Sequence, residues 1–235
     1  MEEFTIGLAL YDFLPGIFIG IALFLIARMV QRTDPSSAPM AYIGAGLVTA
    51  SGVFKALWKL IIATGGPDIV LLDEQLFILM APGFTLTMVA VWSALRARRG
   101  KHSPGWLWVL PVAAIAIVYA IGLYQTLGAG VERGWFQPVM SLASIANLTL
   151  TVLLVIECVR SGKWPVGVLF VINFVMIFPL IAIAQMSEIS IAMHWFEQTL
   201  TVGQSAAFAL AAYLLSRTVT TQLPETPSVA PAAGR

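Results

Sequence analysis

Long apolar runs separated by short polar connections dominate the chain. A helix needs about 20 apolar residues to cross the hydrocarbon core of a bilayer, and seven runs reach that length. They cover about residues 7–30, 40–64, 70–95, 105–126, 136–159, 164–186 and 191–216. Because every connection is short, successive helices are expected to be antiparallel neighbours. The pattern predicts an all-α integral membrane protein with seven transmembrane helices, built as one bundle over residues 1–217.

Composition agrees with that class and narrows the chemistry. Hydrophobic residues make up 59% of the chain and charged residues 11%, against about 25% charged residues in soluble domains. The formal net charge of +1 gives no sign of nucleic-acid binding. Cys158 is the single cysteine, which excludes an internal disulfide, and neither a cofactor nor a metal is expected. Residues 218–235 are rich in Thr, Pro and Ala, which predicts a disordered cytoplasmic tail.

The basic residues predict how the bundle is oriented in its membrane. They gather in alternate connections: Arg28 and Arg32, then Arg96, Arg98, Arg99 and Lys101, then Arg160 and Lys163, and finally Arg217. Under the positive-inside rule these ends are cytoplasmic, so the N-terminus lies outside and the C-terminus inside. The predicted location is the plasma (inner) membrane as a multi-pass protein. The lipid bilayer is then one partner, and a second copy of the chain is a candidate for another.

A repeated pair of residues suggests an internal duplication. Glu74-Gln75 returns as Glu197-Gln198 after a shift of 123 residues, and each pair lies near the start of an apolar run. Phe13 and Pro15 match Phe136 and Pro138 at the same shift. These matches predict that spans one to three are repeated as spans five to seven, with span four as a linker. Both triplets would then run in the same direction, as a parallel repeat about an axis along the membrane normal.

Charged side chains are predicted to form a layer in the outer third of the bundle. Helical rise places six of them at similar depth: Asp12, Lys55, Lys59, Glu74, His194 and Glu197. In the functional interpretation, Lys55 is held by Glu74 or Glu197, and His194 with Glu197 handles a proton. In the alternative interpretation the charged groups near the interface, Asp73 among them, only reach the headgroup region. A metal at His194 is not expected because no second histidine is at hand.

A second, uncharged polar layer is predicted near the bilayer centre. Asn147, Asn173 and Gln204 fall there, on three different spans. Such amides either hydrogen-bond across helices or line a substrate path. Pro15, Pro82, Pro111 and Pro179 are expected to interrupt or bend their helices. The predicted substrate-binding set combines both layers: Lys55, Glu74, Gln75, Asn147, Asn173, Glu197, Gln198 and Gln204.

Three families share parts of this plan. Microbial rhodopsins have seven spans with an outer N-terminus, but residues 200–217 contain no lysine to carry retinal. The three-plus-one-plus-three plan is similar to that of the SWEET sugar transporters, of whose paired prolines only Pro15 and Pro138 match. The segment Asp73-Glu74-Gln75-Leu76-Phe77 resembles the acidic pair of heterodimer-type lycopene cyclases, without their Pro-x-Glu-Glu pattern.

Three functions remain open from the sequence. The favoured function is a small-solute carrier with a charged site in the outer third of the bundle, and it predicts a path that continues inward past Asn147 and Asn173. A membrane enzyme acting on a lipid or isoprenoid predicts a pocket open sideways to lipid, with Glu74 or Glu197 as the general acid and His194 as a further catalytic candidate. A sensor or accessory subunit predicts binding without turnover. The ligand expected in each case is a small molecule or a lipid.

Overall fold

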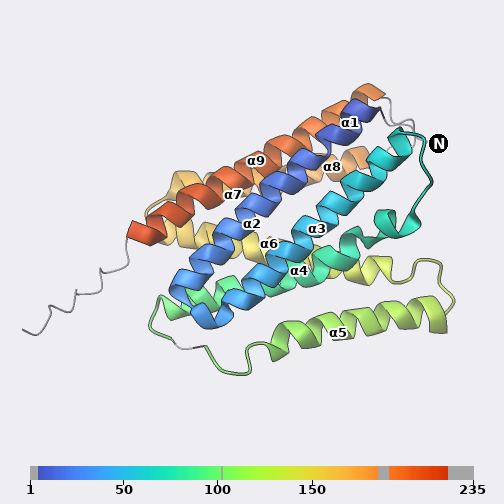
Figure 1. The fold of residues 1–235 in the computed structure, drawn as a ribbon. Helices are drawn as coiled ribbons and strands as arrows, with labels where there is room; N and C mark the ends of the chain where they lie inside the picture. The colour runs from blue at the N-terminus through green and yellow to red at the C-terminus, as the bar shows by residue number, and fades with distance from the viewer. Residues whose placement is uncertain (1–4, 102, 185–190, 222–235) are drawn as a thin grey trace, which may run out of the picture.

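The computed structural model describes residues 5–101, 103–184 and 191–221, and within these ranges every regular element is a helix (Figure 1). The elements are α1 (Ile6–Tyr11), α2 (Phe13–Thr33), η1 (Pro35–Ser37), α3 (Ala38–Ala63), α4 (Val70–Ala97), α5 (Val109–Leu123), η2 (Tyr124–Gly128), α6 (Phe136–Arg160), α7 (Trp164–Val175), α8 (Ile177–Ala184) and α9 (Ile191–Thr221). The predicted all-α fold is confirmed.

The long helices follow the predicted spans closely. Six stretches are long and apolar enough to cross a membrane, by length and composition: Ile6–Thr33, Pro35–Ala63, Val70–Ala97, Val109–Gly128, Phe136–Arg160 and Ile191–Arg217. The span predicted over 164–186 is instead a broken helix, α7 and α8, and its last two residues lie outside the described ranges. Helix α9 continues past Arg217 to Thr221, and the rest of the predicted tail also lies outside them. These helices are compatible with a polytopic membrane protein.

The helices pack as a ring with one helix outside it. Helix α2 packs on α3 and α9, α4 packs on α3 and α6, and α7 joins α6 to α9. Helices α2 and α4 also touch across the ring. Of the ring helices in the described ranges, α5 packs on α4 and α6, and it stands apart from the other helices in Figure 1. The ring therefore follows the chain order of spans one to three and then five to seven.

Two helix breaks have the same cause. Proline has no N–H to donate to the carbonyl four residues earlier, and its ring clashes with that carbonyl. Pro15 follows Tyr11 by four residues, and the helix is interrupted between Tyr11 and Phe13. Pro179 follows Val175 in the same way, and α7 ends there. Pro111 needs no such break because it lies in the first turn of α5.

Small residues set the tightest helix contact. A Cβ added at Gly44 of α3 would lie 2.4 Å from the Thr87 hydroxyl and 2.5 Å from the Gly83 carbonyl of α4. In lipid, helices gain little from apolar contact alone, so close backbone approach at small residues drives their association. Helices α3 and α4 consequently share the most extensive contact of the ring.

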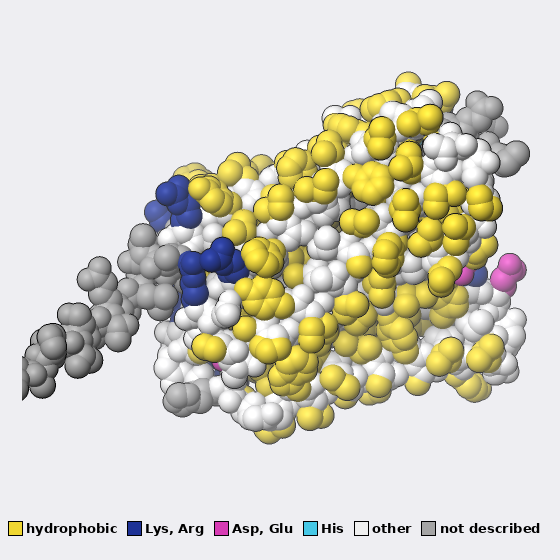
Figure 2. All heavy atoms as spheres, in the orientation of Figure 1, with side chains coloured by type: hydrophobic (Ala, Val, Ile, Leu, Met, Phe, Trp, Pro, Cys, Tyr) yellow, Lys and Arg dark blue, Asp and Glu magenta, His cyan; other side chains and the backbone are white. Residues whose placement is uncertain are grey.

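The two ends of the bundle carry side chains of opposite charge. Figure 2 shows Lys and Arg side chains gathered at one end and hydrophobic side chains over the flank beside it. The basic end carries Arg28, Arg32, Arg98, Arg160 and Arg217; the acidic end carries Asp12, Asp68, Asp73, Glu74 and Glu197. Because the flank is apolar, only the ends are suited to contact water.

Candidate functional site

A central cavity lies inside the ring. It encloses about 230 Å³ and is lined from α2, α4, α6, α7, α8 and α9. Its polar lining is made of amides and one hydroxyl: Asn147 and Ser144 of α6, Asn173 of α7 and Gln204 of α9. Its apolar lining is Ile19, Phe77, Met80, Phe84, Ala143, Ile177 and Phe208. The three amides that the sequence places at the bilayer centre therefore meet in one cavity.

The amides are only partly satisfied by one another. The Asn173 side-chain nitrogen donates to the backbone carbonyl of Gln204 at 3.1 Å, which links α7 to α9. The side-chain oxygen of Gln204 is buried and accepts no hydrogen bond from the described residues. A buried acceptor without a donor costs about 1–3 kcal/mol. Gln204 thus brings to the cavity lining a side chain whose acceptor no described residue uses.

The helix break at Met176 lies beside the cavity. Asn173 and Ile177, on either side of the break, both line the cavity. Pro179 leaves the carbonyl of Val175 without its helical donor. Irregular backbone at membrane depth is tolerated where it borders a cavity or is buried in protein. The break thus places irregular backbone beside the amide cluster.

The cavity is closed toward the basic end. On α2, α6, α7 and α9, the residues about one or two turns further toward that end are at most 1% exposed: Leu23, Ile26, Leu150, Leu154, Phe170 and Leu215. Toward the acidic end, Met140 and Thr201 are only half-buried, and Ser144 of the lining is exposed. The packing therefore favours access from the acidic end.

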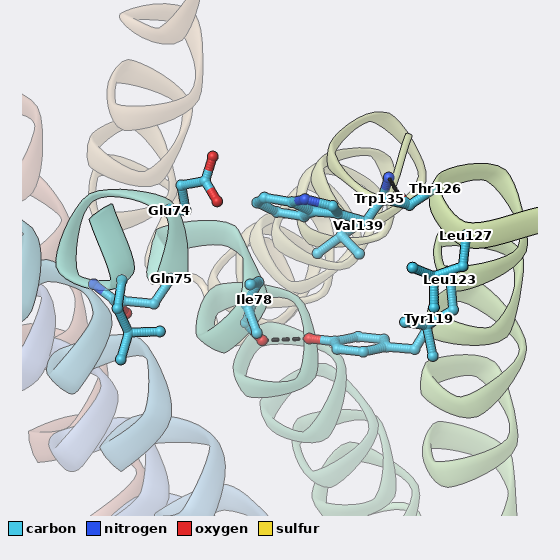
Figure 3. Close-up of a pocket in the computed structure, with 10 residues that line it drawn as sticks. Glu74, Gln75, Ile78, Tyr119, Leu123, Thr126, Leu127, Trp135 and Val139 are labelled. Carbon is cyan, nitrogen blue, oxygen red and sulfur yellow. Dashed lines mark hydrogen bonds between the residues drawn. The ribbon is translucent and has the colours of Figure 1, made fainter. Parts of the chain in front are cut away.

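A second, lateral cavity lies between the ring and α5 (Figure 3). It encloses about 330 Å³ and is lined from α4, α5, η2 and α6, with Glu74 and Gln75 at one side. Leu71, Leu123 and Leu127 border it and are 74%, 58% and 80% exposed. The backbone N–H of Trp135 donates to the Thr126 hydroxyl at 3.0 Å, which closes the far side. This cavity opens sideways, onto the apolar flank of the bundle.

A tyrosine fastens α5 to α4 at the lateral cavity. Pro82 lies within the continuous helix α4 and cannot donate to the carbonyl of Ile78, four residues earlier. The hydroxyl of Tyr119 on α5 donates to that carbonyl instead (Figure 3). Pro82 therefore neither ends nor breaks its helix, because a neighbouring side chain replaces the missing donor.

The charged layer is present at the acidic end, but its pairing differs from the expectation. Lys55 forms its ion pair with Asp73, not with Glu74 or Glu197. Consecutive residues point about 100° apart on a helix, so when Asp73 faces α3 its neighbour Glu74 turns away. Glu74 pairs with Arg133 at 3.3 Å.

Two further charged pairs lie at the acidic end, one between helices and one within α9. Lys59 lies 3.0 Å from Asp12, beside the break between α1 and α2. His194 Nδ1 lies 3.8 Å from Glu197, its neighbour on α9. Within the described ranges no third His, Cys, Asp or Glu joins them in a group that could hold a metal ion.

The predicted site residues thus fall into three groups: those that line the central cavity, those that line the lateral cavity, and those that line neither. Asn147, Asn173 and Gln204 line the central cavity, and Glu74 with Gln75 lines the lateral one. Lys55, His194, Glu197 and Gln198 line neither cavity. Gln75 and Gln198 are both buried, at 7% exposure. The Gln75 amide nitrogen donates to the carbonyls of Ser51 and Leu72, both at 3.2 Å.

Two polar contacts at the basic end had no counterpart in the sequence interpretation. Arg98, after α4, pairs with Glu157 of α6, which is 9% exposed at its side chain. Asp34 accepts hydrogen bonds from Ser36, Ser37 and Ser93. Burial opposes ionisation of Asp34, but the hydrogen bonds from the three serines outweigh it and lower its pKa. In the sequence, Glu157 is an acidic residue at a span end that is otherwise basic, and this feature could have indicated its ion pair.

Comparison with known protein families, curated proteins and solved structures finds no match to this chain.

Proposed function

We propose that the protein is a carrier of small, uncharged polar solutes, with its binding site in the central cavity. The observation that supports this most directly is the meeting of Asn147, Asn173 and Gln204 in one cavity at the middle of the ring. Carrier sites commonly lie near the bilayer midplane, beside discontinuous helices. The break between α7 and α8 supplies such a helix here.

The lining indicates the class of solute. No charged side chain is among the described residues that line the cavity, so an ion would lack a counter-charge in a low-dielectric site. Amides donate and accept hydrogen bonds, and the phenylalanines offer apolar contact. The 230 Å³ volume corresponds to about seven or eight water molecules, which suits a solute of a few heavy atoms.

Several features support the duplication within this proposal. Glu74 and Glu197 have similar side-chain exposure, 32% and 34%. Phe13 and Phe136 each begin a long helix, α2 and α6. In the ring, α2 meets α9 and α4 meets α6, which is the order expected of two triplets facing each other. Rocking of one triplet against the other about the central cavity would then give alternating access.

One ion pair at the basic end is suited to gate that motion. Arg98 with Glu157 joins the end of α4, in the first triplet, to α6, in the second. Lys55 with Asp73 and Lys59 with Asp12 join helices within the first triplet at the acidic end, so they hold that triplet together as it moves. In this proposal the basic end faces the cytoplasm at the plasma membrane, and the Arg98–Glu157 pair breaks when the cavity opens to that side. The charged residues then act on the motion without contacting the solute.

Reconstituted vesicles test the proposal. The purified protein is placed in liposomes, and entry of glycerol, urea and acetamide is followed by light scattering, with protein-free liposomes for comparison. We expect saturable entry of at least one neutral solute. Gln204→Leu removes about one hydrogen bond to the solute and is expected to slow entry about tenfold. Gln137→Leu is the matched control, because Gln137 is an exposed amide on α6 outside the cavity.

Two outcomes contradict the carrier proposal. In the first, none of the solutes enters faster than in protein-free liposomes. In the second, Gln204→Leu and Gln137→Leu slow entry equally, so that the effect does not come from the cavity.

An enzyme acting on a lipid or isoprenoid is the second candidate, because the lateral cavity opens sideways and has Glu74 in its lining. Glu197 does not line that cavity, so Glu74 alone would be its carboxylic acid. Under this alternative, Glu74→Gln abolishes conversion of a membrane lipid and Gln204→Leu leaves it intact. Lipid extracts from membranes with each variant distinguish the two candidates.

A further inference from the structure

A basic cleft lies between α2 and α9 at the basic end of the bundle. It encloses about 190 Å³ and is lined by Arg28 and Arg32 from α2 and by Tyr213, Ser216 and Arg217 from α9. Leu25 and Met29 complete its lining with apolar surface. The cleft is separate from both the central and the lateral cavity, with which it shares no lining residue.

The cleft has the chemistry of a phosphate site. Arg28 and Arg32 are four residues apart and therefore share one face of α2, while Arg217 comes from the opposing helix. The Arg217 guanidinium lies 5.6 Å from the centre of the Tyr213 ring, a cation–π contact that holds it at the cleft. Guanidinium groups present planar pairs of donors that match phosphate oxygens. No Asp or Glu is among the described lining residues.

Apolar stripes run from the cleft along both helices toward the middle of the bundle. Ile21 and Ile17 precede Arg28 by seven and eleven residues, so they lie on its face of α2. They are 48% and 47% exposed. On α9, Leu210 precedes Arg217 by seven residues and is 49% exposed. An exposed apolar stripe on a membrane helix is suited to contact acyl chains.

We propose that this cleft binds one anionic phospholipid. Its phosphate lies among Arg28, Arg32 and Arg217, and its acyl chains follow the stripes on α2 and α9. Free phosphate has the same charged group but no acyl chains to contact the stripes. Experiments can therefore distinguish binding of the phospholipid from binding of free phosphate. The proposal is independent of transport, because the cleft and the central cavity have different residues.

Lipid titration in neutral detergent tests the site. Cys158 is the single cysteine and is buried, so a maleimide dye reports unfolding when heating exposes it. Short-chain phosphatidylglycerol is expected to raise the unfolding temperature, and phosphatidylcholine is not. A surface arginine contributes about fivefold to binding of anionic lipid. The triple variant Arg28→Gln, Arg32→Gln, Arg217→Gln is therefore expected to bind about a hundredfold more weakly.

A matched triple variant controls for net charge. Arg99→Gln, Lys101→Gln and Lys163→Gln remove three exposed basic side chains outside the cleft and are expected to retain the response. If the cleft variant is too unstable to purify, Arg28→Gln alone is expected to weaken binding about fivefold. Native mass spectrometry of retained lipid gives a second readout.

Three results would overturn the proposal. Equal loss of phosphatidylglycerol binding in the cleft and control variants would mean general charge attraction. Stabilisation by inorganic phosphate equal to that by phosphatidylglycerol would mean a site for free phosphate. Full retention of the lipid by the cleft variants would mean that the lipid binds elsewhere.

Discussion

At the scale of single residues, the clearest interaction is the hydrogen bond from Tyr119 to the Ile78 carbonyl, which Pro82 leaves without a helical donor. The proline removes a backbone donor from α4, and the tyrosine of α5 supplies another to the same carbonyl. The Ile78 carbonyl therefore needs the hydrogen bond from Tyr119 only because Pro82 cannot donate to it. This dependence can be measured as a coupling between two substitutions.

Tyr119→Phe is expected to destabilise the protein by about 1 kcal/mol, because the Ile78 carbonyl loses its donor. With Pro82→Ala as well, the restored helical N–H satisfies that carbonyl, and the cost of Tyr119→Phe should fall close to zero. Thermal unfolding followed by the reactivity of Cys158 measures all four proteins. An equal cost of Tyr119→Phe with and without Pro82→Ala would contradict this explanation.

The sequence was least informative about which side chains contact each other. Depth along a helix predicted the charged layer at the acidic end, since depth follows from residue number. The pairing of Lys55 with Asp73 rather than with Glu74 or Glu197 depends on how each helix is rotated about its axis. Hydropathy alone sets no such rotation when apolar residues surround the whole helix. The amides of the central cavity were placed at one depth, but their convergence could not be derived.

At the scale of helices, close backbone contact between α3 and α4 holds one side of the ring. Gly44→Ala would place a methyl group against the Gly83 carbonyl, which belongs to the backbone and cannot rotate away. We expect this substitution to destabilise the protein by about 1–3 kcal/mol. Gly46→Ala is the matched control on the same helix, because nothing lies within 4 Å of its added Cβ.

Gly46→Ala is expected to be neutral or to stabilise by up to about 1 kcal/mol, through the better helix propensity of alanine. Unfolding in a titration with denaturing detergent measures both variants. Equal effects at the two glycines would show that contact between α3 and α4 does not depend on Gly44.

The helices themselves were largely predictable, and their breaks were only partly so. Apolar runs of sufficient length identified every long helix, because hydrophobic thickness sets a minimum length. Of the four prolines expected to interrupt or bend their helices, Pro15 and Pro179 lie beside breaks, while Pro82 lies within a continuous helix. The difference depends on whether a neighbouring group replaces the missing donor. Helix α5, by contrast, carries no charged or amide side chain, unlike the other long helices, and the duplication pattern separates its span from the two triplets as a linker.

At the scale of the whole molecule, the separation of charge between the two ends connects architecture to function. The basic end closes the central cavity with fully buried side chains and carries the arginine cleft, whereas the acidic end holds the ion pairs around Lys55 and Lys59. If the basic end is cytoplasmic, the cavity is reached from outside, and the proposed phospholipid lies in the inner leaflet. Both proposals therefore share one orientation.

Cysteine labelling tests that orientation, because the only native cysteine, Cys158, is buried. Val131 lies in the connection after η2 at the acidic end and is 51% exposed, and Arg99 is exposed at the basic end. A membrane-impermeant maleimide added to intact cells is expected to label Val131→Cys and to leave Arg99→Cys unlabelled until the membrane is opened. A permeant maleimide, which should label both, controls for accessibility. The opposite labelling pattern would place the acidic end inside, and the central cavity would then collect its solute from the cytoplasm.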